Sequence, residues 1–487
     1  MLKAFFRDSA VYGLAKVLTG GITLLSLPIY THALPPGEYG IVDLITSLAT
    51  IAHVTVALEI AQGLGRFILS PEAEGKQKQY ASTALWFTLA TYSLFAAAVI
   101  PLGTLVSRAL FQTDANATIV RVATLVIWTT GIFNLVQNLL RYGRRAPKYA
   151  LVSILFSVTN VGVTILLLLV LKAGVVAMFI GQFCAGLTAV ALGLFFNRDM
   201  IRPIFDRERA KEMLKFSIPL VPSGIGIMLC MYVDRFAVLK LLTVDDLGRY
   251  AVAFRVATVV AIVVTGFDAA LAPLIYQNHH KPETPGQLAR MLQWFLALAS
   301  PLLLFLGIFA KLIVSIVAPA TYAGAASLVF MLSASMLVAN LYNFSPGLWV
   351  AKRTGWVAII SLGAGVLNLG INFVLIPRVG LVGAAIGTIT ASLTACAAHY
   401  IFGRFLYPVP FQWGRLAIAI GAVGVIGVMG PRVEAGIPLR AVVWILSSAV
   451  IAAFLLGTED LKMILEKARS LPEILRARRR VAEEQRS

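Results

Sequence analysis

The segment FSIPLVPSGIGIMLCMYVDRFAVLKLL, residues Phe216–Leu242, decides how the rest of the chain is interpreted. It is apolar and long enough to cross the hydrocarbon core of a membrane, yet it carries Asp234 and Arg235 in its interior. Charged side chains at that depth are costly, and they normally face other helices or a water-filled cavity rather than lipid. The segment therefore predicts a membrane helix whose charged residues point into the protein.

The composition of the whole chain agrees with this interpretation. Of the 487 residues, 59% are hydrophobic and only 13% are charged, which is typical of a membrane protein with many spans and not of a water-soluble domain. We predict an all-α polytopic membrane protein with about 14 transmembrane helices. The expected spans are residues 9–31, 41–65, 81–107, 119–140, 149–171, 174–196, 216–242, 250–275, 289–317, 322–350, 355–376, 380–403, 414–431 and 439–457.

Two distant blocks of sequence repeat with one constant separation. In the first block Gly40 aligns with Gly248, and in the second Asn160 aligns with Asn368, so both pairs are 208 residues apart. We interpret this as a duplication of six helices. Because six crossings return a chain to its starting side, the two copies are parallel repeats that form two lobes. The expected divisions are an N-lobe at 1–207, a C-lobe at 208–407, two extra helices at 408–457 and a basic cytoplasmic tail at 458–487.

The distribution of positive charge predicts the orientation. The net charge is +18, but the basic residues are not arranged as a nucleic-acid surface. Of the 41 Lys and Arg residues, 29 lie in the even-numbered connections and the two tails, and 10 lie on the opposite side. Positive residues accumulate on the cytoplasmic side of membrane proteins. We therefore expect both termini in the cytoplasm and no nucleic-acid partner.

The thirteenth expected helix carries glycines at every third position. Gly421, Gly424, Gly427 and Gly430 leave the helix surface without side chains, and such spacing allows a neighbouring backbone to approach closely. We expect this helix to pack tightly against another.

A few ionisable residues lie deep in the expected spans, mostly on the first two helices of each repeat. A cavity with positive groups at two depths would hold an anionic phosphate or diphosphate head group. The carboxylates would balance charge while the cavity is empty, or bind a coupling proton or cation. The candidate substrate-binding residues are Lys16, Arg235 and Arg255, and the candidate charge-balancing or ion-coupling residues are Glu59, Asp234, Asp268 and His53.

The same residues could instead have structural roles. Lys16 with Glu59, and Arg235 with Asp234 or Asp268, could be static pairs between helices of a scaffold. Arg255 could extend to the membrane interface. His53 is of a residue type that is more often a hydrogen-bonded packing residue than a ligand.

Motifs of common enzyme classes are missing from the sequence. There is no GxxxxGK[ST] phosphate loop, no Cys/His cluster with metal-ligand spacing and no GxSxG nucleophile turn. A transferase would need an acid or histidine constellation at one membrane face, and the sequence offers none. We expect no enzymatic activity, no cofactor and no metal.

Six short motifs together identify a resemblance that covers nearly the whole chain. They are LPPGEYGIVDL at 34–44, DRF at 234–236, DDLGRY at 245–250, KRTGW at 352–356, NLGIN at 368–372 and TEDLKMIL at 458–465. The chain resembles the Wzx-type polysaccharide biosynthesis flippases of the MOP (multidrug, oligosaccharidyl-lipid, polysaccharide) exporter superfamily.

The resemblance implies a flippase of the bacterial cytoplasmic (inner) membrane that works by alternating access. It would move an undecaprenyl-diphosphate-linked oligosaccharide, a unit of O-antigen, capsule or exopolysaccharide, from the inner to the outer leaflet. Lys16, Arg235 and Arg255 match by type and place the cations thought to receive such a substrate. The expected partners are the lipid-linked oligosaccharide, membrane lipids, a polysaccharide polymerase and glycosyltransferases.

Two alternatives within the same superfamily remain open. The two extra helices are similar to those of lipid II flippases, although the run of arginines that those proteins carry in helix 1 is missing here. A cation-coupled multidrug exporter would favour a buried acid in helix 1, where this chain has Lys16.

Overall fold

The computed structural model describes residues 2–68, 70, 75–351, 353–430, 436–457 and 460. All regular secondary structure in this part of the chain is helical. The expected basic tail lies outside the described residues except for Asp460.

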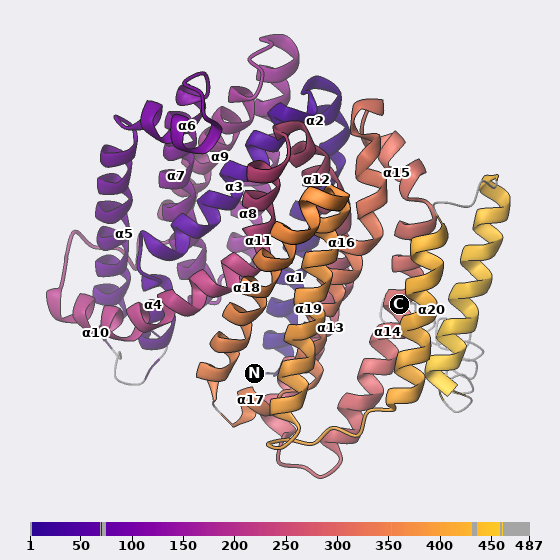
Figure 1. Cartoon of the computed structure of the whole chain (residues 1–487). Helices are drawn as coiled ribbons and strands as arrows, with labels where there is room; N and C mark the ends of the chain where they lie inside the picture. The colour runs from indigo at the N-terminus through magenta and orange to yellow at the C-terminus, as the bar shows by residue number, and fades with distance from the viewer. Residues whose placement is uncertain are drawn as a thin grey trace, which may run out of the picture.

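The first helix group comprises α1 to α9, and its helices are α1 (Leu2–Leu25), α2 (Leu27–Ala33), α3 (Pro36–Thr55), α4 (Ile60–Ile68), α5 (Gln77–Val99), α6 (Gly103–Phe111), α7 (Ala117–Tyr142), α8 (Ala146–Ile165, continued by a π-helical turn at Leu166–Val170) and α9 (Val176–Phe196). After α10 (Arg207–Ser217) comes the second helix group, with α11 (Val221–Leu241), α12 (Val244–Ala257), α13 (Val260–Asn278), α14 (Thr284–Ile308), α15 (Ala310–Val317), α16 (Ala326–Val338), α17 (Gly347–Val350), α18 (Thr354–Val379) and α19 (Leu381–Gly403). The described helices end with α20 (Trp413–Met429) and a final helix, Ile437–Gly457. Figure 1 shows the two groups side by side, with α20 and the final helix on the outer side of the second group.

The fold class predicted from the sequence is confirmed. Among the described residues, 11 helices are long and apolar enough to cross a membrane, or up to 13 if each of two bent helix pairs counts as one span. The bent pairs are α3 with α4 and α12 with α13, and α20 is a shorter apolar helix. The protein is therefore an all-α polytopic membrane protein. The number of about 14 spans stays a prediction.

Two pairs of helices begin at the separation found in the sequence repeat, and the duplication itself stays a prediction. Helices α3 and α12 begin at Pro36 and Val244, and α8 and α18 begin at Ala146 and Thr354, so both pairs of starts are 208 residues apart. The packing is also matched, because α8 packs on α1 and α9 in the first group as α18 packs on α11 and α19 in the second.

The bend between α3 and α4 stores backbone strain. Leu58 and Glu59 have φ angles of 50° and 54°, in the left-handed region that side chains with a Cβ seldom adopt. The two helices meet there at 50°. Strained residues of this kind persist only where surrounding packing holds them, and they are concentrated at functional sites. Glu59, one of the sequence candidates, thus lies at an irregular point inside a membrane span.

The polar connection between the two groups forms α10. The Asp206 carboxylate caps this helix by accepting hydrogen bonds from the backbone N–H groups of Glu208 and Arg209, at 2.9 and 3.2 Å, which satisfies two of the unpaired donors of the first turn. The hydroxyl of Tyr80 on α5 donates to Glu212 at 2.6 Å. The helix consequently lies across one end of the first group, against α4 and α5 (Figure 1).

Candidate functional site

The two helix groups meet most closely where α3 lies against α12. A Cβ atom on Gly40 would lie 2.6 Å from the Val244 carbonyl oxygen, and one on Gly248 would overlap the Pro36 carbonyl oxygen. Only glycine allows this approach. The two glycines are the pair that the sequence alignment matched, so residues 208 positions apart face each other here.

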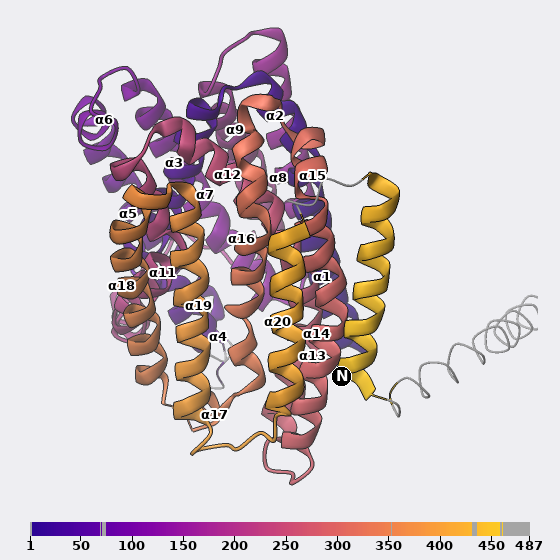
Figure 2. The same cartoon turned by 45° about the vertical axis from the view of Figure 1, so that its right-hand side comes forward.

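Hydrogen bonds join the groups at the same end of the molecule, where α2, α3, α12 and α15 come together (Figure 2). The Thr31 hydroxyl donates to the Val317 carbonyl at 2.5 Å, and the Tyr322 hydroxyl donates to the Leu34 carbonyl at 2.8 Å. The rings of Tyr39 and Tyr322 are 6.5 Å apart in an edge-to-face arrangement. This end of the interface is closed; we call it the closed end.

An ion pair links the groups next to this contact. The side chain of Arg235 on α11 is 1% exposed, and its Nε donates to the carboxylate of Asp43 on α3 at 2.7 Å. Its Nη1 donates to Asp234 at 3.1 Å and to the Met231 carbonyl at 3.2 Å. The guanidinium carbon also lies 4.1 Å from the centre of the Phe254 ring. The charge of Arg235 is therefore compensated by one carboxylate from each helix group.

The second carboxylate, Asp234, is itself fully buried and held by several donors. It accepts hydrogen bonds from the Tyr250 hydroxyl on α12 and from the Thr388 hydroxyl on α19, the latter at 3.3 Å. Arg255, half buried on α12, interacts with Tyr39 and Asp43. Arg235, Arg255, Asp43 and Asp234 form one group of two positive and two negative charges, which we call the ion-pair cluster.

Two buried amides lie close to this cluster. Asn368 and Asn372 on α18 are fully buried, and among the described residues their side-chain nitrogen and oxygen atoms have no hydrogen-bond partner. Both face α19, since a Cβ on Gly387 would lie 2.8 Å from Asn368 Oδ1 and would overlap Asn372 Oδ1. The next residue, Thr388, donates to Asp234. A buried polar group without a partner costs about 1–3 kcal/mol, so this arrangement favours a ligand for the amides.

His53 belongs to a different, uncharged cluster inside the first helix group. Its Nδ1 is 2.9 Å from the Tyr92 hydroxyl and its Nε2 is 3.2 Å from the Thr130 hydroxyl. Both ring nitrogens are therefore satisfied by hydroxyl groups, as expected for a hydrogen-bonded packing histidine. Glu59 lies at the border of this region, with Oε1 3.4 Å from the position of a Cβ on Gly224 of α11.

The structure brings together some of the sequence candidates and separates others. Arg235, Arg255 and Asp234 belong to the ion-pair cluster. Lys16 is exposed on α1, and among the described residues no salt bridge joins it to Glu59. Asp268 lies on α13, but its side chain is outside the described residues.

Sequence reasoning missed Asp43, the residue that carries the link between the two groups. A usable signal was present, because Asp43 follows Gly40 by three residues and so shares its helix face. The alignment of Gly40 with Gly248 marks that face as the one that meets the other repeat. Tyr250 and Thr388 carried no comparable signal.

The comparisons with known proteins agree with this architecture. A family model described as "Polysaccharide biosynthesis protein" matches residues 31–343. The chain belongs to the polysaccharide biosynthesis protein family. A relative from Haloferax volcanii, the "Probable low-salt glycan biosynthesis flippase Agl15", is 22% identical over 420 residues, which cover 84% of this chain and 86% of the relative.

Solved structures show that this family member has the fold of MOP-superfamily transporters. An inward-facing multidrug resistance MATE-family transporter aligns with a TM-score of 0.65 at 16% identity, covering 81% of this chain and 97% of that one. An outward-facing multidrug resistance MATE-family transporter aligns with a TM-score of 0.55 at 16% identity, covering 83% of this chain and 95% of that one. A MOP-superfamily transporter from Pyrococcus furiosus aligns with a TM-score of 0.53 at 16% identity, over the same shares.

Proposed function

We propose that the protein is a flippase that moves an undecaprenyl-diphosphate-linked oligosaccharide from the inner to the outer leaflet of the bacterial cytoplasmic membrane. The observation that carries this proposal is the buried pair of Arg235 and Asp43, which spans two helix groups at one closed end. The family match and the glycan-flippase relative support the substrate class. Both termini lie in the cytoplasm in this proposal, in accordance with the distribution of positive charge.

In the proposed mechanism the two groups are lobes that alternate in access. The closed end faces outward, which agrees with the greater likeness to the inward-facing transporter. Lys16, exposed on α1, meets the diphosphate first from the cytoplasmic side. When the lobes separate at the closed end, Asp43 on α3 moves away from Arg235 on α11, and the diphosphate replaces this carboxylate as the partner of Arg235 and Arg255.

Exchange of one anion for another explains why the cluster is neutral. An uncompensated arginine inside a membrane protein costs several kcal/mol, so the carboxylates hold the cations while no substrate is present. A phosphate offers the same bidentate geometry to a guanidinium. The lobes would then separate at the closed end only when the negative diphosphate of the substrate takes the place of the Asp43 carboxylate.

A coupling cation would bind at Asp234 in this proposal. Asp234, Thr388 and the two unpartnered amides of Asn368 and Asn372 supply oxygen ligands, which hard cations prefer. The described residues contain no group of three or more His, Cys, Asp and Glu that could hold a metal ion. A set with a single carboxylate fits a monovalent ion such as sodium, or a proton on Asp234.

The test of the main proposal is movement of the lipid-linked substrate. Proteoliposomes that contain the protein and a fluorescent undecaprenyl-diphosphate sugar should lose fluorescence to an external quencher faster than empty liposomes. Arg235→Gln should slow this movement at least tenfold. Arg249→Gln is the matched control, because Arg249 lies nearby on α12 but pairs with Asp246 at a partly exposed position; it should change the rate less than twofold.

The two alternatives predict different results in the same assay. A lipid II flippase would move lipid II faster than the oligosaccharide-linked lipid. A drug exporter would lower the sensitivity of cells to cationic drugs and would leave both lipids in place. Equal rates for Arg235→Gln and the unchanged chain would show that the cluster serves only to hold the scaffold together.

A further inference from the structure

Helix α20 packs on α14, and its glycines show where the two backbones come close. Gly427 lies against α14, where a Cβ on Gly307 would be 2.9 Å from the Gly427 carbonyl oxygen, and a Cβ on Gly430 would be 2.8 Å from Ile308. Gly421 and Gly424 have nothing within 4 Å of a Cβ. The predicted close approach is thus confirmed for Gly427 and Gly430. Nearer its start α20 is also packed, since Leu416 and Ala419 are buried and the Trp413 ring lies 4.6 Å from that of Tyr400 on α19.

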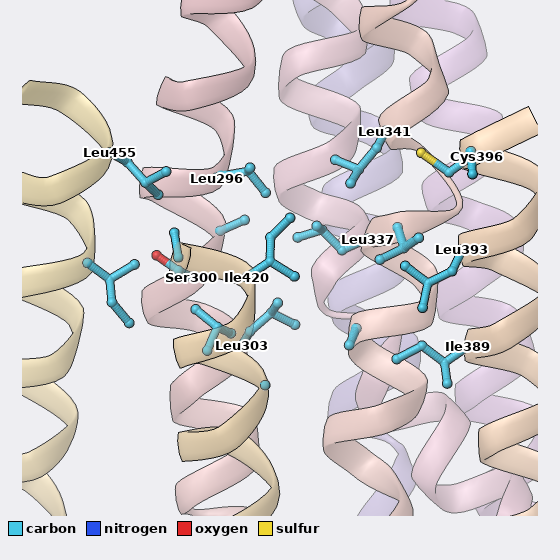
Figure 3. Close-up of a pocket in the computed structure, with 18 of the residues that line it drawn as sticks. Leu296, Ser300, Leu303, Leu337, Leu341, Ile389, Leu393, Cys396, Ile420 and Leu455 are labelled. Atoms are coloured by element: carbon cyan, nitrogen blue, oxygen red, sulfur yellow. The ribbon is translucent and has the colours of Figure 1, made fainter. Parts of the chain in front are cut away.

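The space that opens between these helices is an apolar cavity of about 470 Å³. Its walls come from α14, α16, α19, α20 and the final helix. Figure 3 shows the side chains that point into it, and the labelled ones are hydrocarbon apart from the Ser300 hydroxyl and the Cys396 sulfur. A second apolar cavity of about 270 Å³ shares Leu296, Trp413 and Ile420 with the first. Together they form a continuous apolar groove.

A polar pocket of about 500 Å³ lies next to the groove along the same helices, where Gln293 is three residues before Leu296 and Leu456 follows Leu455. Along both α14 and α20, residues that line the polar pocket come before residues that line the apolar cavity. On α14, Arg290 and Gln293 line the polar pocket and Leu296 and Leu303 line the apolar cavity. On α20, the sequence runs from Arg415 in the polar pocket to Gly424 in the apolar one. The combined site therefore has one polar end and one long apolar arm.

Two arginines give the polar end its charge. The Nε of Arg290 donates to the buried Asp460 carboxylate at 2.9 Å, and about half of the Arg290 side chain is exposed. Arg415 is exposed, and its Nη1 would lie 3.4 Å from a Cβ on Gly457. Gly457 has a φ of +72° and no side chain to cover the guanidinium. Among the described residues that line the pocket, two arginines and one aspartate leave one net positive charge.

Aromatic residues place this polar end at the depth of lipid head groups. The Trp413 indole N–H donates to the Tyr400 hydroxyl at 3.2 Å, and the two rings are 4.6 Å apart. Tryptophan and tyrosine concentrate at the boundary between hydrocarbon and water. The pocket beside them therefore lies at the membrane surface, and the apolar arm runs into the hydrocarbon.

We propose that this groove binds an anionic phospholipid, with its phosphate between Arg290 and Arg415 and one acyl chain in the apolar arm. The arm extends along α14 from Arg290 to Leu303, which is about 20 Å at 1.5 Å per residue, or roughly one leaflet of the bilayer. An ordinary acyl chain ends within one leaflet. A polyprenyl chain is longer than the arm and would extend beyond it, whereas an acyl chain fits within it.

The bound lipid gives α20 and the final helix a structural role. Besides the contact near Gly427, the indoles of Trp413 and Trp444 donate hydrogen bonds to α19 and α14. The lipid fills the gap that remains between these helices and α14, α16 and α19. The site lies outside the ion-pair cluster and does not depend on the proposed flippase activity. In the proposed orientation it opens to the inner leaflet.

The lipid retained by the purified full-length protein tests the proposal. Protein extracted in a mild detergent should carry about one anionic phospholipid per chain, measured by mass spectrometry of extracted lipids. After removal of lipid, native mass spectrometry should show that phosphatidylglycerol rebinds at least fivefold more tightly than phosphatidylcholine. Arg415→Ala should reduce both retention and the preference for phosphatidylglycerol at least threefold. Lys281→Ala, an exposed basic residue outside the groove, is the control and should change neither.

A second pair of variants tests the apolar arm. Gly424→Phe places a ring at the cavity from a position where a Cβ meets nothing within 4 Å, and Gly421→Phe adds the same ring at an equally open position that does not line the cavity. The first should reduce lipid retention at least threefold and the second should not. The proposal is wrong if no lipid is retained, if Arg415→Ala retains as much as the unchanged chain, or if the retained molecule is a polyprenyl diphosphate.

Discussion

The two halves of the chain each bury a polar cluster in a membrane span, and the two clusters differ in what they join. In the first half, His53, Tyr92 and Thr130 form hydrogen bonds among helices of one group. In the second half, Arg235 joins α11 to Asp43 of the other group. A cluster inside one group can persist while the groups move, whereas a cluster between groups has to break. If the groups move as proposed, the first cluster stays intact and the second is the one that breaks.

The largest effect should come from blocking the closed end itself. Gly248→Ala introduces a Cβ that overlaps the Pro36 carbonyl oxygen, and a backbone atom cannot move aside as a flexible side chain can. We expect substrate movement to fall at least tenfold. The distance between spin labels on α3 and α12 should lengthen. Gly266→Ala on α13, where a Cβ meets nothing within 4 Å, is the control and should behave as the unchanged chain.

Removing one charge of the ion-pair cluster should come next. Asp43→Leu leaves Arg235 with one carboxylate instead of two, and loss of one partner from a buried pair costs about 3–5 kcal/mol. We expect the closed arrangement to lose stability by that amount, visible as a lower unfolding temperature and a longer distance between labels on α3 and α12.

The double variant Asp43→Leu with Arg235→Met separates stability from transport. Replacing both members of a buried pair by apolar residues is often neutral for stability, so the unfolding temperature should recover. Substrate movement should stay low, because the arginine that receives the diphosphate is gone. Recovery of transport in the double variant would contradict the proposed role of Arg235.

The uncharged cluster of the first half should tolerate substitution better. Tyr92→Phe removes one hydrogen bond to His53, which is worth about 1 kcal/mol, and keeps the ring that packs on Gly131. We expect a small decrease in unfolding temperature and a transport rate within twofold of the unchanged chain. A tenfold loss of transport would mean that the first cluster also takes part in the conformational cycle.

Much of the fold could be predicted from the sequence, and the limits have physical causes. Hydrophobic length predicts membrane spans because lipid requires every backbone group to be paired within the helix. The break between α3 and α4 was not predicted, since residues 54–60 contain neither proline nor glycine and the bend depends on packing. The burial of Asp234 and Arg235 followed from their depth, but the partner Asp43 lies 192 residues away. Such a pairing depends on how the two groups dock.

The smallest effect is expected for a partly exposed ion pair, in contrast to the buried pair of Arg235 and Asp43. Arg145 donates to Asp199 at 2.8 Å and joins α8 to the segment after α9 within one helix group. The hydrogen bond from Arg145 holds the pKa of Asp199 below its usual value. Because the lowered pKa belongs to the folded protein, the stabilisation is complete above the unfolded pKa of about 4 and disappears as the pH falls through the lower, folded one.

Asp199→Asn should therefore lower stability by no more than about 1 kcal/mol near neutral pH, as for other partly exposed pairs. The difference in unfolding temperature between Asp199→Asn and the unchanged chain should be constant from pH 8 to pH 5 and should shrink below pH 4. Transport should be unaffected, since the pair lies within one group and does not separate when the groups move. A transport loss as large as that of Asp43→Leu would show that location between the groups is not what makes an ion pair important in this protein.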